Sequence, residues 1–539
     1  MNWNDSSKPL SRRGFVELTS LAVAGAVLSR GPSQQADALE EVTVAQLQDG
    51  MRSGRLTSRG VTQAYLDRIA ALDRREGGPT LRSVLEPNPD ALAIADAMDA
   101  ERRRGRVRGP LHGIPVIVKD NIDTHDRMQT TAGSLALEGN IALRDAFIVE
   151  RLRAAGAVIL AKANLSEWAN FRSNRSSSGW SGRGRQCRNP YVLDRTPSGS
   201  SSGSGTAVSA NLCAVAVGTE TDGSIISPSN ACGIVGIKPT VGLVSRSGII
   251  PLAHSQDTAG PMCRTVADAA ALLTALAGID PRDAATAAAD GHIAADYTTF
   301  LDPNGLKGAR VGVQRRSGNN PIVDRVVESA IAVLKAQGAD VVDPADIETA
   351  GQLGSNERDV LQYEFKADLN AYLATMPQEV KVRTLADLIA FNEANKDREM
   401  PYFGQETFIA SQARGPLTDQ AYLDARARCV ELTRAKGIDA TMEKHRLDAM
   451  MGPSGGVASL VDLAGGGGGG GGAGSSQFPA VAGYPHITVP AGVHFGLPLG
   501  ISFYGRAWSE PVLVRLAYAF EQATRVRKAP TFLPTLALS

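Results

Sequence analysis

Short apolar runs rich in β-branched residues alternate with helical patterns along most of this chain. The runs begin or end near glycine, as buried strands do. Runs of this composition lie at residues 113–119, 157–160 and 213–219, and further strands are expected at residues 310–313, 340–342, 447–454, 486–492 and 499–505. No element of this kind can be stable alone, so the strands must share a sheet that the helices cover. The alternation predicts an α/β fold, with a single large mixed β-sheet core covered by helices on both faces.

The helical patterns place apolar residues at three- and four-residue steps. Helices are expected at residues 42–75 (two helices), 145–156, 265–278, 325–338 and 512–524. Thr265 and Asp268 have the spacing of a capping box at the start of one of them. Residues of about 350–450 are richly helical and more charged, which predicts a peripheral excursion covering one side of the sheet.

Composition excludes several classes of protein. The 539 residues are 43% apolar and 21% charged, so the chain is not intrinsically disordered as a whole. Lys plus Arg equal Asp plus Glu, 56 each, so no electrostatic footprint for nucleic acid is present. The five cysteines are an odd number with no Cys-x-x-Cys pair, which argues against a disulfide scaffold and a thiolate zinc site. A monomer without nucleic-acid or membrane partners is expected.

No Pro/Ser-rich linker interrupts the alternation, so a single domain over residues 39–539 is expected. Its catalytic core would span about 80–280, and its last strands and helix about 475–530. The eight consecutive glycines from Gly465 to Gly472 predict a mobile surface loop, because glycine loses the most entropy on ordering.

The N-terminal segment has the features of an export signal. Ser11-Arg12-Arg13-x-Phe15 resembles the twin-arginine pattern, an apolar stretch runs from Leu18 to Leu28, and Ala36-Asp37-Ala38 offers a small-x-small cleavage site. Residues 1–38 are therefore predicted to be a twin-arginine signal peptide, cleaved near Ala38, that delivers a periplasmic or secreted protein without a membrane anchor. The alternative is an amphipathic first helix of the fold.

A Gly/Ser-rich segment at residues 197–206 is open to more than one interpretation. Such composition is typical of a flexible linker. It also contains Gly-x-Ser-x-Gly around Ser201, the nucleophile-elbow pattern of α/β-hydrolases. The elbow needs a strand directly before it, and the preceding residues 188–197 contain two prolines, which a central strand does not accept.

Lys119 ends the apolar run 113–119. A lysine buried there is driven toward its neutral form, which can act as a general base. The alternative is a surface lysine with only its stem buried. The seven histidines show no metal-ligand spacing, so no metal is expected.

Four segments together resemble the amidase signature family, over roughly residues 80–530. They are GIPVIVKDNID from Gly113, the Gly/Ser segment through GTETDGSI (218–225), GIVGIKPT (233–240) and the carboxyl-terminal AGYPHITVPAG with LPLGISFYGRAWSE. LSEWANFR, SSGWSGRG and GTETDGSI are most similar to the peptide amidases within that family.

The resemblance implies a Ser-cisSer-Lys triad. Ser224 matches the nucleophile, Lys119 the base, and Ser200 the bridging serine that follows a cis peptide bond from Gly199. The segment Ser198 to Gly203 holds several serines, so the bridging position is ambiguous, but the 24-residue offset between positions 200 and 224 favours Ser200.

The family's oxyanion hole falls on the backbone amides of Thr221, Asp222, Gly223 and Ser224. Asp222 and Ile226 depart from the general Gly-Gly-Ser-Ile-Arg pattern, and both changes also occur in peptide amidases. Asp257 and Lys238 lie in other family segments, where packing and turn formation are the expected roles.

The resemblance implies hydrolysis of C-terminal carboxamides of peptides to the free acid and ammonia, with no metal and no organic cofactor expected. Two alternatives stay open. One is an amidase of small aryl or aliphatic amides with the same triad. The other is a binding protein on an inactive hydrolase scaffold, which the presence of Lys119, Ser200 and Ser224 disfavours.

Overall fold

One sheet of eleven strands runs through the part of the chain that the structure describes. The computed structural model describes residues 39–316, 320–465 and 474–536. The strand order is β1-β3-β2-β4-β6-β5-β10-β11-β9-β7-β8. The strands are β1 (Val84–Pro87), β2 (Pro115–Lys119), β3 (Val158–Ala163), β4 (Val215–Glu220), β5 (Val235–Lys238), β6 (Thr258–Cys263), β7 (Arg310–Val313), β8 (Asp340–Val342), β9 (Ala449–Pro453), β10 (His486–His494) and β11 (Leu497–Tyr504).

The sheet is mixed, as the sequence predicts. β3, β2 and β4 are parallel neighbours at one end, and β9, β7 and β8 are parallel neighbours at the other. Between them, β4, β6, β5, β10, β11 and β9 pair antiparallel. Every run expected to be a strand forms one, within two or three residues of its expected ends.

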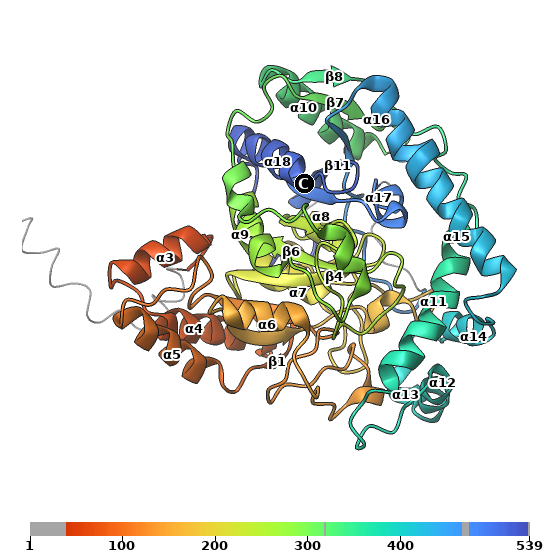
Figure 1. Ribbon diagram of the computed structural model, residues 1–539. Coiled ribbons are helices and arrows are strands. Elements are labelled where there is room, and N and C mark those ends of the chain that lie inside the picture. Colours follow the sequence, from red (N-terminus) through yellow and green to blue (C-terminus); the bar gives the residue numbers. More distant parts are fainter. Residues whose placement is uncertain (1–38, 317–319, 466–473, 537–539) are drawn as a thin grey trace, which may run out of the picture.

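Two groups of helices cover the sheet and confirm the α/β architecture (Figure 1). α7 (Ser202–Ser209) and α8 (Ile226–Ala231) touch each other and pack on the central strands. α6, α9, α10 and α18 form the second group, in which α18 contacts both α9 and α10. Their bounds are α6 (Phe147–Ala154), α9 (Val266–Leu276), α10 (Pro321–Ala336) and α18 (Glu510–Thr524).

The amino-terminal helices are α3 (Val44–Arg52), α4 (Ser58–Arg68) and α5 (Ala91–Arg103), of which α5 contacts β3 and α4 contacts β2. A capping box at α9 is only half formed. The hydroxyl of Thr265 accepts a hydrogen bond from the Asp268 amide at 3.1 Å. The Asp268 carboxylate, however, accepts from the Val44 amide at 2.9 Å rather than from the cap itself. The predicted box is wrong in this respect, because the carboxylate is used to attach α3.

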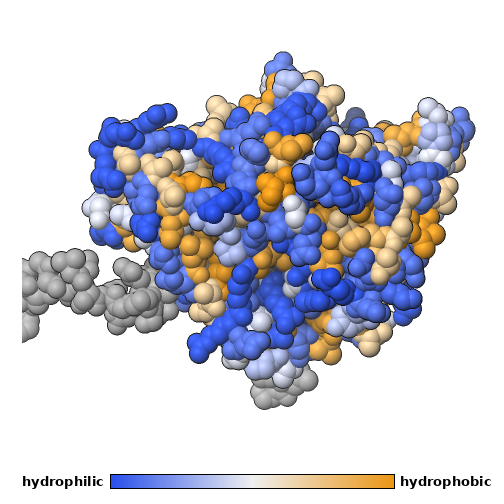
Figure 2. Space-filling view, turned by 90° about the horizontal axis from the view of Figure 1, so that it is seen from below, coloured by the Kyte–Doolittle hydropathy of each residue, from blue (hydrophilic) through white to orange (hydrophobic). Residues whose placement is uncertain are grey.

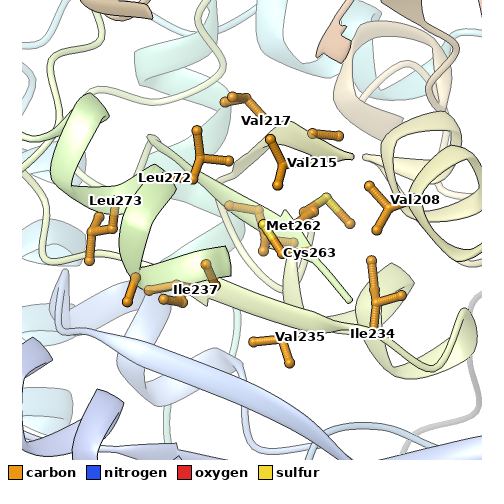
Figure 3. Close-up of a cluster of buried hydrophobic side chains, with 14 of the residues drawn as sticks. Val208, Val215, Val217, Ile234, Val235, Ile237, Met262, Cys263, Leu272 and Leu273 are labelled. Carbon is orange, nitrogen blue, oxygen red and sulfur yellow. The ribbon is translucent and has the colours of Figure 1, made fainter. Parts of the chain in front are cut away.

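The central core lies between β4, β6 and the helices on either side (Figure 3). Val215 and Val217 on β4 and Met262 on β6 are fully buried, as are Val208 on α7 and Leu272 on α9. Strands buried on both faces carry near-continuous apolar residues, which explains why residues 213–219 are recognisable as a strand.

β6 is a central strand that the hydropathy pattern does not reveal. It contains Gly260 and Pro261, which are both poor strand formers. β5 pairs with β6 only at Met262 and Cys263, so Pro261 lies beyond that ladder. A Cβ on Gly260 would overlap the carbonyl oxygen of Ile237 on β5. Glycine is therefore required by the close approach of the two strands.

The helical excursion runs along one side of the molecule (Figure 1). It consists of α11 (Asn356–Leu373), α12 (Leu385–Ala394), α13 (Lys396–Glu399), α14 (Glu406–Gln412), α15 (Gln420–Thr433) and α16 (Asp439–His445), and α17 (Gln477–Ala482) packs on α15. One apolar cluster joins α11 and α15 to Met450 and Tyr504 on the sheet. A second joins α11, α12 and α14 to Trp168 and Leu252 in loops beside the sheet.

Hydrophilic and hydrophobic residues are interspersed over the face shown in Figure 2. Among the described residues, no helix combines the length and the apolar character needed to cross a bilayer. The predicted signal peptide, residues 1–38, lies outside the described residues, as does nearly all of the predicted loop Gly465–Gly472.

Candidate active site

The site lies where two parallel strands end. β2 and β4 are neighbours in register, with Val118 opposite Val217, so their carboxyl ends meet at one edge of the sheet. Lys119 is the last residue of β2. Its Nζ donates hydrogen bonds to Thr219 near the end of β4, at 2.8 Å to Oγ1 and 3.3 Å to the carbonyl oxygen. The side chain is fully buried, which rules out the surface alternative for this lysine.

Ser200 enters the site from the loop before α7. Lys119 Nζ also donates to Ser200 Oγ at 2.8 Å, and the Ser200 hydroxyl is buried with it. The Gly199–Ser200 peptide bond is cis, as the resemblance implies. A Cβ on Gly199 would overlap Ser166 Oγ, so the crowding there requires glycine.

The neighbouring Ser201 has other partners. Its hydroxyl donates to the Thr219 carbonyl at 3.0 Å and accepts from the Thr219 amide at 3.2 Å. No hydrogen bond joins Ser201 to Lys119 within the described chain, so the geometry resolves the ambiguity in favour of Ser200 as the lysine's partner. The nucleophile elbow around Ser201 is not formed, because the preceding strand, β3, ends at Ala163.

Ser224 lies in the turn between β4 and α8. The Ser201 amide donates to the Ser224 carbonyl at 3.1 Å, which places Ser224 beside the Ser200 segment. The residue is largely buried, with 8% of its surface exposed. No hydrogen bond links the Ser224 hydroxyl to another part of the chain that the structure describes. The hydroxyl is therefore available to a substrate.

The turn presents unpaired donors. Within the described residues, the backbone amides from Thr221 to Ser224 donate no hydrogen bond to the chain. The next two amides, of Ile225 and Ile226, donate to the buried Glu220 carboxylate at 2.6 and 3.0 Å. Gly223 has a φ of +74°, which favours glycine. Consecutive free amides at a turn can stabilise a developing oxyanion.

Burial sets the charge of the lysine. It lowers the pKa of Lys119 from its ordinary value to about 7, against the opposing influence of Asp257 and Glu220. A large fraction of Lys119 is thus uncharged at neutral pH, as a general base requires. Lys238 is also buried, with its pKa lowered to about 8, but it donates to the carbonyls of Pro239 and Tyr484 and so has a packing role.

Asp257 forms a turn, as expected. Its carboxylate accepts from the amides of Leu252 and Ala253 at 2.7 and 2.8 Å, and from the Thr221 hydroxyl at 2.5 Å. Burial raises the pKa of Asp257 to about 6. The carboxylate therefore holds the 252–253 turn against the end of β4.

Three polar residues next to the turn are not identified by sequence reasoning. Glu220 lies inside the GTETDGSI segment, and its position four residues before Ser224 could have identified it as a site residue. Gln256 lies beside Asp257 in another family segment. Glu357 is on α11, in no motif, and the sequence holds no signal for it. Asp222, meanwhile, accepts from the Ser476 hydroxyl at 2.7 Å, and burial raises its pKa.

A cavity of about 200 Å³ opens beside the site. Asn121, Thr219 and Thr221 line its inner end, and the apolar residues 249–252 form a wall. Asn121 Nδ2 donates to Thr219 Oγ1 at 3.1 Å, the same oxygen that Lys119 contacts. The cavity therefore adjoins the lysine end of the site through Asn121 and Thr219.

His254 and Asp368 line the same cavity and, with Glu364, form the group of side chains in the described chain best placed to bind a cation. The carboxylates of Asp368 and Glu364 already accept hydrogen bonds from the chain. Asp368 accepts from the His254 amide at 3.0 Å, and Glu364 accepts from the Tyr422 hydroxyl at 2.8 Å. The group is thus a hydrogen-bonded cluster of the protein itself.

Comparison with known proteins agrees with this fold. The Amidase family model matches residues 60–514. A probable amidase of Arabidopsis thaliana is 43% identical over 504 residues, covering 92% of this chain and 92% of its own. The crystal structure of native peptide amidase from Stenotrophomonas maltophilia has a TM-score of 0.86 and 52% identity, covering 92% of this chain and 99% of its own. That of an amidase family protein from Bacillus anthracis has a TM-score of 0.85 and 37% identity, covering 93% and 94%.

The fold and these relatives together define the protein as an amide hydrolase. It belongs to the amidase family, which confirms the resemblance found in its sequence motifs.

Proposed function

We propose that the protein hydrolyses the C-terminal carboxamide of peptides to a free carboxylate and ammonia. The observation that carries the proposal is the 2.8 Å contact between the buried Lys119 amine and the Ser200 hydroxyl. The turn with the unpaired amides of residues 221–224 is tied to the same segment by the hydrogen bond from the Ser201 amide to the Ser224 carbonyl. The 52% identity to a solved peptide amidase supports this substrate class.

In the proposed reaction Ser224 is the nucleophile. Its oxygen attacks the amide carbon while Ser200 accepts its proton and passes its own proton to uncharged Lys119. The amides of Thr221, Asp222, Gly223 and Ser224 stabilise the negative oxygen of the tetrahedral intermediate.

Collapse of the intermediate releases ammonia and leaves an ester on Ser224. The lysine ammonium returns its proton through Ser200 to the leaving nitrogen. Water then attacks the ester, and the same relay accepts the water proton and returns it to Ser224. Proton delivery is essential here because NH₂⁻ is a very poor leaving group.

We propose that the cavity beside the site receives the peptidyl acyl group. Its apolar wall at residues 249–252 offers contact for an uncharged side chain next to the amide, while His254 and Asp368 lie in a more polar part. A peptide extending from the reacting carbon would occupy this cavity, and a small amide would leave much of it unfilled.

The test is ammonia release from an amidated dipeptide. We expect release by the purified protein and a loss of about 10³-fold or more in Ser224→Ala, since residual catalysis without the nucleophile is small. Ser227→Ala, in α8 just past the turn, is the matched control and should keep its activity. Undiminished release by Ser224→Ala would reject the proposed nucleophile.

Substrate profiling distinguishes a peptide amidase from the alternative, an amidase of small aryl or aliphatic amides. For a peptide amidase, kcat/KM should rise when a peptidyl residue is added to an amino-acid amide. For the alternative, it should be unchanged or fall.

We also propose that the protein is exported in folded form. The support is the Ser11-Arg12-Arg13-x-Phe15 pattern. Expression in a bacterium with a twin-arginine system should place the active protein outside the inner membrane, with its N-terminus near residue 39. Replacing Arg12 and Arg13 by lysine should keep it inside. Active external protein that retains Met1 would contradict a cleaved signal.

A further inference from the structure

Gln256 connects the candidate oxyanion turn to the helical excursion. It follows Ser255 in the loop before β6 and is 1% exposed. Its side-chain amide, Nε2, donates to the carbonyl oxygen of Thr221 at 3.2 Å and to Glu357 Oε1 at 3.3 Å. One buried amide group therefore joins the turn to α11, a helix more than 130 residues away in the sequence.

Glu357 is held from its other side. Its second oxygen, Oε2, accepts from Gln477 Nε2 at 2.8 Å, at the start of α17. The residue next to Gln477, Ser476, donates to Asp222 at 2.7 Å. Burial, together with the charge of Asp222, raises the pKa of Glu357 to about 8. Three separate segments of the chain are thus linked to Thr221 and Asp222, through the Thr221 carbonyl and the Asp222 carboxylate.

The contact to Thr221 has a directional consequence. In a trans peptide unit the C=O and the next N–H point in opposite directions and rotate together as one plane. A donor fixed on the Thr221 oxygen therefore fixes the direction of the Asp222 N–H on the opposite side. That N–H is one of the unpaired amides of the turn.

We propose that Gln256 is a positioning residue for the oxyanion hole, and that Glu357 holds its side-chain amide in place. The inference rests on the proposed function, because it assumes that the amides of residues 221–224 face the reacting carbonyl. Gln256 does not touch the substrate. It acts by keeping the Thr221–Asp222 peptide plane aligned before the charge develops, so its effect belongs to the transition state rather than to substrate binding.

Replacement of Gln256 would leave the buried Thr221 carbonyl without this donor and the peptide plane free to turn. Removing a complete oxyanion donor costs about 10²–10³ in kcat. Misalignment of one donor should cost less, so we expect a fall in kcat of roughly 10- to 100-fold with KM within about threefold.

The experiment compares Gln256→Met with Gln362→Met. Methionine conserves the volume of glutamine and removes the amide. Gln362 is a buried residue of α11 whose side chain accepts from Arg414, away from the turn, and it is the matched control. The readouts are kcat and KM for an amidated dipeptide, and the inhibition constant of a peptidyl trifluoromethyl ketone, whose hydrated or serine-bound oxygen mimics the oxyanion.

The expected result is a lower kcat and a weaker ketone inhibition by the same factor in Gln256→Met, and neither in Gln362→Met. An unchanged kcat in folded Gln256→Met overturns the inference. So does an equal fall in both variants, which would indicate a general effect of losing a buried glutamine.

A second pair of variants tests the role of Glu357 and does not depend on the folding of Gln256→Met. Glu357→Gln keeps an oxygen to accept from Gln256 and should retain kcat within about threefold. Glu357→Met removes the acceptor and should reproduce the loss. Equal kcat in these two variants overturns the inference. If Ser224→Ala is fully active, the proposed function itself fails; if Ser224→Ala is inactive but the Gln256 and Glu357 variants are normal, only the positioning role fails.

Discussion

Lys119 shows how an apolar run and a charged residue can both belong to the same strand. From the sequence alone, a lysine at the end of residues 113–119 could extend to solvent or lie buried. The structure buries it completely, where it contacts Ser200 and Thr219. Burial disfavours the ammonium form because the charge loses its hydration. The packing that destabilises the charged lysine therefore also supplies the reaction with a neutral amine as a base.

The pH dependence of activity should report this lysine. The pKa of Lys119 is lowered to about 7, so the amine is neutral and competent above that pH and protonated below it. We expect kcat/KM to level off above pH of about 8 and to fall roughly tenfold per unit below about 6.5. Initial rates of ammonia release between pH 5 and 9 would show this. A flat profile across that range would contradict a titrating base of this pKa.

Adjacent serines should differ sharply in their effect on the rate. Ser200→Ala removes the hydroxyl that contacts Lys119, and we expect a loss of about 10³-fold in kcat. Ser201→Ala removes only hydrogen bonds to the Thr219 backbone, so it should cost about 1 kcal/mol of stability and leave kcat within roughly tenfold. Steady-state kinetics and thermal unfolding of both variants measure these outcomes. The reverse order of effects would assign the relay to Ser201.

Some site residues could be identified from sequence motifs and others could not. Lys119, Ser200 and Ser224 lie in short motifs with characteristic neighbours, and the structure brings Lys119 and Ser200 into contact with Ser224 close by. Gln256 and Glu357 act only through contacts between distant segments. A single sequence does not encode such contacts in any local pattern, so they could not be predicted.

At the level of elements, a strand could be predicted from the sequence where its residues are apolar. It could not be predicted where its residues are chosen by the close approach of a neighbouring strand. β2, β4 and β11 are buried among apolar neighbours and are visible as apolar runs, β-branched in β2 and β4. β6 is determined instead by how closely β5 approaches it at Gly260, a property that leaves no apolar periodicity. The half-formed capping box at Asp268 also depends on a contact between distant segments. The Asp268 carboxylate accepts from the Val44 amide of α3 instead of from the Thr265 amide beside it.

Gly260→Ala tests the role of close approach. The new Cβ would overlap the Ile237 carbonyl oxygen, which lies in a rigid backbone, so we expect the free energy of unfolding to fall by roughly 2–3 kcal/mol or more. Gly404→Ala is the control, because its Cβ would meet only the flexible Glu406 carboxylate at 3.3 Å. Urea denaturation compares the two. Equal stability of both variants would show that β5 can move away at little cost.

At the scale of the whole molecule, the helical excursion is attached by a buried ion cluster. The Arg172 side chain is 1% exposed and donates to the Glu167 carboxylate at 2.5 Å and to the Glu399 carbonyl, at the end of α13, at 2.6 Å. Its guanidinium also stacks 4.4 Å from the ring centre of Phe403. These contacts fix one end of the excursion against the loop that follows β3.

Arg172→Met should therefore weaken the whole protein. Removing one partner of a buried ion pair leaves an uncompensated charge, so we expect a loss of roughly 3–5 kcal/mol in the free energy of unfolding. Arg316→Met removes an exposed arginine 3.9 Å from Asp346 and should change stability by less than about 0.5 kcal/mol. Denaturant unfolding measures both, and similar losses in the two variants would refute a special role for Arg172.

The overall architecture could be predicted from the alternation of strands and helices, since that pattern is repeated from end to end of the sheet. The order of strands could not. β5 and β10 are neighbours although some 250 residues separate them. Pairing over such distances is decided by complementary packing surfaces, which composition and periodicity do not specify.

The convergence of remote segments on one turn has a consequence for how the protein matures. The lysine, the two serines, Gln256 and Glu357 span almost half the chain, and no two of the first three lie in the same strand or helix. A partly assembled molecule would have native-like secondary structure and yet no working centre. Recovery of catalysis after dilution from denaturant should therefore lag behind the return of circular dichroism, and would serve as a sensitive gauge of complete assembly.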